Sequence, residues 1–114
     1  MGGSDLFTGT LDLLILRTLE PEARHAYGVG RVLREGSEGV LEVAEGVLYP
    51  ALHRLEARGF LKASWGPSES GRRAKFYALT REGRAHLAAE LEKWKRLEGA
   101  VRDVLDSAAS GGAA

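Results

Sequence analysis

The chain has 114 residues, a net charge of zero and no cysteine. This length suits one domain with a modest core. The lack of cysteine excludes disulfides, thiolate nucleophiles and cysteine-based zinc sites. No apolar run approaches the roughly 20 residues that a membrane helix needs, and no basic segment precedes the apolar residues 13–16 as in a secretory signal. We therefore expect a cytoplasmic protein with no membrane partner.

Charge is unevenly distributed along the chain. Residues 44–84 carry eight basic and four acidic side chains, a net charge of +4, and the segments on either side are slightly acidic. For nucleic-acid binding, the distribution of charge matters more than its total. The central segment is therefore where a DNA-binding surface is expected.

Three helices are expected in the first half of the chain. Residues 6–19 predict a helix with little polar face, which a second subunit should help to bury. A second helix, at about 27–37, has one apolar stripe. A third is expected over 45–58, where Pro50 requires either a late start or an irregular first turn.

The hydrophobic period then changes. Residues 60–65 and 74–79 predict the two strands of a hairpin, joined by a long tip over 66–73 that is rich in turn-forming residues. Thr80 is a good N-cap for a final helix over 81–106. Apolar residues recur every three or four positions along this helix and have no partner left in the chain, which predicts a homodimer.

This order of elements predicts a mainly α fold with a small β-hairpin: a winged helix-turn-helix followed by a C-terminal dimerisation helix. The expected division is a winged-helix domain over 1–80, the dimerisation helix over 81–106 and a disordered tail over 107–114. The expected dimer interface consists of apolar side chains of the first and last helices, namely Leu11, Leu14, Ile15, Leu87, Leu91, Trp94, Leu97, Val101 and Leu105.

The third helix and the hairpin carry the candidate DNA contacts. A helix fits the major groove of B-DNA, and a flexible basic turn beside Gly71 can follow phosphates or enter the minor groove. The expected contacts are Tyr49, His53, Arg54, Arg58, Arg72, Arg73 and Lys75. Taken singly, each segment also fits an ordinary solvated surface; their order along the chain favours DNA. A dimer would read two half-sites, so we expect a palindromic operator in double-stranded DNA.

Four segments resemble the PadR family of transcriptional regulators. They are GTLDLLIL at 9–16, HAYG at 25–28, VLYPALHRLE at 47–56 and GRRAKFYALT at 71–80. The resemblance covers about residues 6–105 and implies a winged-helix dimer that represses target promoters and is often released by a small effector. It implies that Tyr27 lies near phosphates. Ala74 stands where many relatives carry a basic or polar residue, so the neighbouring cations must supply the charge of the wing.

The role of Trp94 can be interpreted in two ways. Some multidrug-sensing relatives carry a tryptophan at the matching place, where the pair from two subunits lines a flat pore. That resemblance implies a small hydrophobic or aromatic effector against Trp94, Leu91 and Leu14. The alternative is a core or interface aromatic with no ligand. His86 and Glu90 lack a third metal ligand, so we expect no metal, no cofactor and no catalytic site.

Two other functions remain open. The fold could be a winged-helix module whose basic surface contacts an acidic protein partner. It could also be a dimeric binder of hydrophobic ligands that has lost DNA affinity. Salt-dependent binding to duplex DNA distinguishes the DNA-binding hypothesis from both of these alternatives.

Overall fold

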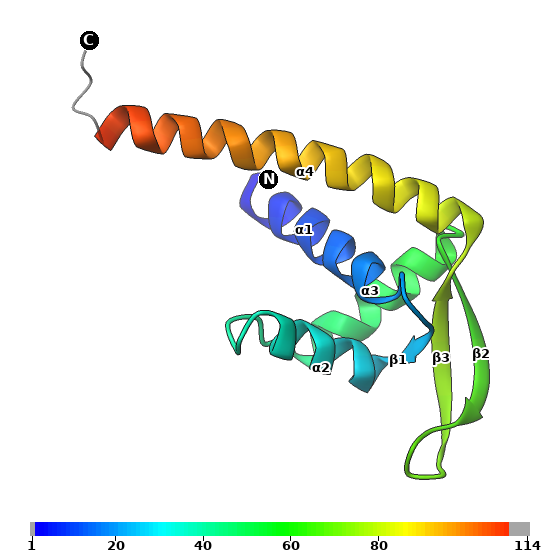
Figure 1. Ribbon diagram of the computed structural model, residues 1–114. Helices are drawn as coiled ribbons and strands as arrows, with labels where there is room; N and C mark the ends of the chain where they lie inside the picture. Colours follow the sequence, from blue (N-terminus) through cyan, green and yellow to red (C-terminus); the bar gives the residue numbers. More distant parts are fainter. Residues whose placement is uncertain (1, 110–114) are drawn as a thin grey trace.

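The computed structural model describes the backbone of residues 2–109 and the side chains of residues 9–107 (Figure 1). The helices are α1 (Gly2–Thr18), α2 (Ala26–Gly36), α3 (Glu45–Ala57) and α4 (Arg81–Ala109). The strands are β1 (Arg24–His25), β2 (Leu61–Pro67) and β3 (Arg73–Leu79). They form one antiparallel sheet in the order β1-β3-β2. This arrangement confirms the predicted winged-helix fold class.

α3 contains Pro50 as its sixth residue and begins before it. The backbone N–H groups of Val47 and Leu48 both donate to the carbonyl of Ala44, each at 2.9 Å, so the first turn is already closed when the chain reaches Pro50. A late start of this helix, one of the two predicted solutions, is therefore wrong. Gly59 then ends the helical region with a φ of 84°, a conformation that favours glycine.

The hairpin is longer and its tip shorter than expected. β2 and β3 pair from Leu61 opposite Leu79 to Pro67 opposite Arg73. Only residues 68–72 form the loop, which the N–H of Ser68 closes by donating to the carbonyl of Arg72 at 2.7 Å. Figure 1 shows this hairpin projecting from the helical body. The wing is thus a paired ribbon with a short tip instead of a long loop.

The core lies where α1, α2, α3 and the base of the hairpin meet. In Figure 1, α1 lies between α4 and α3, and it contacts both helices. Leu11 is 4% exposed, Ile15 0% and Leu87 2%. Their own chain therefore buries these three side chains, which leaves them little surface to offer to the second subunit that was expected to cover them. Leu14 and Leu91 are partly buried and pack against the same core.

The distal half of α4 extends past the other elements (Figure 1). Its apolar side chains stay 37–66% exposed, and we call them the α4 stripe: Trp94, Leu97, Val101, Val104 and Leu105. The helix continues to Ala109, so the first three residues of the expected tail are helical, and residues 110–114 lie outside the described residues. Within the part of the chain that the structure describes, no helix has the length and hydropathy to span a membrane.

Candidate nucleic-acid interface

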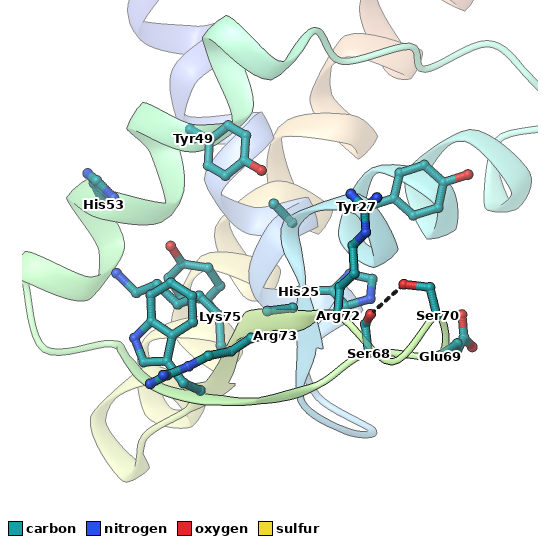
Figure 2. Close-up of a pocket in the computed structure, with 14 residues that line it drawn as sticks. His25, Tyr27, Tyr49, His53, Ser68, Glu69, Ser70, Arg72, Arg73 and Lys75 are labelled. Carbon is teal, nitrogen blue, oxygen red and sulfur yellow. Dashed lines mark hydrogen bonds between the residues drawn. The ribbon is translucent and has the colours of Figure 1, made fainter.

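A groove of about 570 Å³ lies between α3, the start of α2 and the hairpin. Figure 2 shows side chains of all three elements around it. The structure brings together six of the eight predicted DNA contacts there, which are Tyr27, Tyr49, His53, Arg72, Arg73 and Lys75. These residues are up to 48 positions apart in the sequence, and only the packing of the three elements makes them one surface.

α3 separates a buried face from an exposed one. Its buried residues, Leu48, Ala51, Leu52 and Leu55, recur at helical spacing and anchor the helix to the core. Its exposed residues are Glu45, Gly46, Val47, Tyr49, Pro50, His53 and Ala57. Tyr49 and His53 supply hydrogen-bonding groups, and Gly46, Pro50 and Ala57, which lie on the same side at helical spacing, are small or compact. A large partner such as duplex DNA can therefore approach this side of the helix closely.

The wing presents an arginine over an aromatic ring. The guanidinium carbon of Arg73 lies 5.1 Å from the centre of the Trp65 ring, which is a cation–π distance. Trp65 is 59% exposed and lines the groove. Because Arg73 and Lys75 belong to β3, only Arg72 lies on the turn, whereas the expected tip over 66–73 had included Arg73 as well. Sequence reasoning missed Trp65 as a groove residue, although its place on the hairpin beside the basic segment was visible.

The positive charge of Lys75 is partly neutralised by another side chain of the same chain. Its Nζ donates to Oε1 of Glu56 at 3.3 Å and lies 5.3 Å from the centre of the Tyr77 ring. Desolvation lowers the pKa of Lys75, but its hydrogen bond to Glu56 and its electrostatic interactions with Tyr77 and Glu56 raise it by more. The net pKa is therefore raised, and Lys75 stays protonated at neutral pH. The positive charges of Arg72 and Arg73 are therefore less neutralised by neighbouring groups than that of Lys75.

His25 is a second groove residue that sequence reasoning missed. It caps α2: its Nδ1 accepts a hydrogen bond of 3.0 Å from the N–H of Gly28. In the neutral ring Nε2 then carries the proton and can donate to an anion. The ring also packs on Phe76, with centroids 5.2 Å apart. Tyr27 follows the cap and is 68% exposed, so the start of α2 presents two polar aromatic side chains to the groove.

Arg54 and Arg58 do not line this groove. Nη2 of Arg54 donates to Oδ1 of Asp12 on α1 at 2.7 Å. The guanidinium of Arg58 lies over the ring of Phe60, 4.8 Å from its centre. Both arginines were predicted to contact DNA because helical spacing places them outside the apolar stripe. Spacing does not reveal that neighbouring elements supply partners for them.

The three residues expected around a ligand do not form one site within the chain. Trp94 lines a cavity of about 150 Å³ between α1 and α4, together with Leu13 and Leu97. Leu14 lines a different cavity, of about 500 Å³, beside α2. Leu91 packs against the core. A ligand site that joins Trp94 and Leu14 therefore requires a second subunit.

The comparisons with known proteins agree with this geometry. The family model of the transcriptional regulator PadR-like family matches residues 15–89. The chain belongs to this family. The match runs from α1 through the hairpin into α4 and so includes every element that borders the groove.

Relatives of the PadR-like chain cover nearly its whole length. A transcriptional regulator from Clostridium thermocellum is 26% identical, with a TM-score of 0.78 over 87% of this chain and 96% of that one. A PadR family transcription regulator from Clostridium difficile is 31% identical, with a TM-score of 0.73 over 83% of this chain and 97% of that one. An uncharacterised protein from Lysinibacillus sphaericus is 27% identical over 90% of this chain and 91% of its own length. At most 17% of this chain lies outside any one of these matches, which is fewer residues than the 29 of α4, so at least part of α4 belongs to the shared fold.

Proposed function

We propose that this PadR-like regulator binds duplex DNA with α3 in the major groove and the hairpin alongside it. One observation carries the proposal: the exposed face of α3, the start of α2 and the cations of the wing all border a single groove. The diameter of a helix with its side chains, about 10–12 Å, fits a major groove about 12 Å wide. The wing then lies beside the backbone of the same duplex.

The groove residues divide into two roles. Tyr49 and His53 lie on the exposed side of α3 and contact base edges. Phosphates are contacted by Arg72, Arg73 and Tyr27. Contacts to phosphates supply affinity but carry no sequence information. Arg54 does not take part in base reading, because its guanidinium is engaged with Asp12.

We further propose a homodimer joined through the α4 stripe. Burying each such side chain contributes roughly 1.5–3 kcal/mol, so a second copy of this helix is a well-matched partner. A dimer reads two half-sites about 34 Å apart, one helical turn of DNA, and selects a palindrome. By covering promoter DNA in the cytoplasm it acts as a repressor, and a small hydrophobic or aromatic effector near Trp94 releases it.

The decisive experiment is selection of bound fragments from random and genomic DNA, followed by fluorescence anisotropy of the selected duplex. We expect a palindromic site, binding that weakens steeply with salt, and at least about a thousandfold preference over a scrambled duplex. A protein that binds no duplex even at low salt overturns the proposal. If the protein binds no duplex, saturable binding of an acidic protein supports a protein-interaction module, and saturable binding of a hydrophobic dye supports a ligand-binding protein.

The two tryptophans of the chain report on the two proposed sites separately. DNA should quench the fluorescence of Trp65, which lines the groove, and leave Trp94 nearly unchanged. Flat aromatic dyes should do the reverse. The measurement is titration of Trp65→Phe and Trp94→Phe, each of which keeps one emitter. Equal responses of both variants to a dye contradict an effector site at Trp94.

A further inference from the structure

We infer that Arg54 is a positioning residue, which fixes the recognition helix α3 to α1 through Asp12 and does not read DNA itself. This inference rests on the proposed DNA-binding function. Nη2 of Arg54 donates to Oδ1 of Asp12 at 2.7 Å, across 42 positions of sequence. A charged donor and a charged acceptor at this distance form one of the stronger kinds of hydrogen bond.

The environment of the pair favours a fixed geometry. The side chain of Asp12 is only 13% exposed, so its carboxylate has little access to water that could replace the arginine. The Nε of Arg54 is buried and lacks a hydrogen-bond partner among the described residues. The bond from Nη2 to Asp12 is therefore what orients the guanidinium. The side chain of Arg54 is 40% exposed, yet with its guanidinium on Asp12 it does not line the groove.

The pair joins the DNA-facing helix to the helix that contacts α4. Arg54 directly follows His53, which lines the DNA groove. Asp12 directly precedes Leu13, which lines the cavity beside Trp94. A displacement of α1 by an occupant of that cavity, or by a partner helix, would thus act on α3 through this ion pair. The pair is a physical route by which the α4 side of the molecule sets the angle at which α3 meets DNA.

The decisive variant is Asp12→Asn, because two explanations predict opposite results. It removes a negative charge, so general electrostatics predict tighter binding to all DNA. Loss of the positioning bond predicts weaker binding to the selected duplex with little change on a scrambled one. We expect the ratio of the two affinities to fall about 3- to 30-fold, the range of such couplings.

Arg54→Ala and the double variant complete a cycle. If the two residues act as one unit, the double variant loses no more specificity than either single variant. The slope of log affinity against log salt should stay at the wild-type value for Arg54→Ala, because no phosphate contact is lost. Arg17→Ala is the matched control: it also removes one arginine, which pairs with Glu20 near the end of α1, and no ion pair among the described residues joins it to α3. It should keep the wild-type ratio.

Two results would overturn the inference. Normal specificity in Asp12→Asn together with a loss in Arg54→Ala shows that Arg54 contacts DNA and overturns the inference. Thermal unfolding of every variant establishes that binding is measured on folded protein. Hydrogen exchange provides a readout without DNA: in Asp12→Asn the amides of α3 should exchange faster while those of α4 do not, and unchanged α3 exchange also overturns the inference. Absence of DNA binding by the wild type refutes the proposed function and leaves this exchange result to decide on the ion pair.

Discussion

Replacing Arg72 and Arg73 with alanine should weaken binding to every duplex, selected or scrambled, by at least about 100-fold at low salt. Each charged hydrogen bond to phosphate contributes about 1.5–3 kcal/mol. A dimer carries up to four of them, and the loss of only two, at about 1.5 kcal/mol each, already corresponds to about 100-fold. The slope of log affinity against log salt should become shallower by about one per lost contact. Fluorescence anisotropy at several salt concentrations measures both quantities. The ratio of selected to scrambled affinity should change little, because phosphate contacts carry no sequence information.

A second double variant, Lys62→Ala with Arg81→Ala, controls for net charge. It also removes two cations from the basic segment, yet neither residue lines the groove. We expect most of the wild-type affinity to remain. An equal loss in both double variants would mean that the overall field of the protein, and not the wing, attracts DNA. Wild-type binding by the Arg72 and Arg73 variant would show that the wing does not contact the duplex at all.

Placing aspartate at Val101 and Leu105 should convert the proposed dimer into a folded monomer at micromolar concentration. Both residues lie on the exposed half of α4, 48% and 64% exposed, so the core of the chain does not depend on them. In a dimer the change buries four carboxylates where four apolar side chains were, and unpaired buried charge is strongly unfavourable. Sedimentation gives the mass, and circular dichroism checks that the helices persist. DNA affinity should fall by about 100-fold or more, because the two half-sites are no longer bound together.

The control for this variant is Arg96→Asp on α4. It lowers the charge by the same two units as the pair of aspartates, and Arg96 lies about half a turn away from Trp94, outside the α4 stripe. It should remain a dimer. Leu91 is unsuitable for the test, because it packs against the core and its replacement mixes folding with association. A dimer that survives both aspartates at Val101 and Leu105 would place the interface elsewhere.

Local patterns along the chain predicted most of the fold. Apolar spacing identified the helices, the change of period identified the hairpin, and Thr80 marked the start of α4, where its hydroxyl accepts from the N–H of Gly83. β1 was missed because two residues, Arg24 and His25, are too few for a strand pattern. They pair with Tyr77 and Phe76 of β3, a contact that exists only once the chain has folded.

The candidate site was harder to predict than the fold, because tertiary contacts decide which exposed cation is available. Helical spacing made Arg54 look equivalent to His53, yet one is bonded to Asp12 and the other lines the groove. The same limit applied to Leu87: the apolar stripe of the last helix looked unpartnered, although α1 contacts α4 and Leu87 is buried. Spacing shows that a side chain leaves the apolar face, whereas the identity of its neighbour depends on segments far away in the sequence.

The strand order β1-β3-β2 leaves β2 as an exposed edge, and an exposed edge can pair with the edge of another molecule. This chain carries two features that oppose such aggregation. Lys62 is exposed on β2, and a lysine on an edge strand opposes pairing with another chain because pairing would remove its charge from water. Pro67 ends the strand without an N–H to donate, next to Gly66, which favours a bend. Both features suit a hairpin that has to project far enough to reach along a duplex and still remain soluble at the concentrations at which a regulator is synthesised.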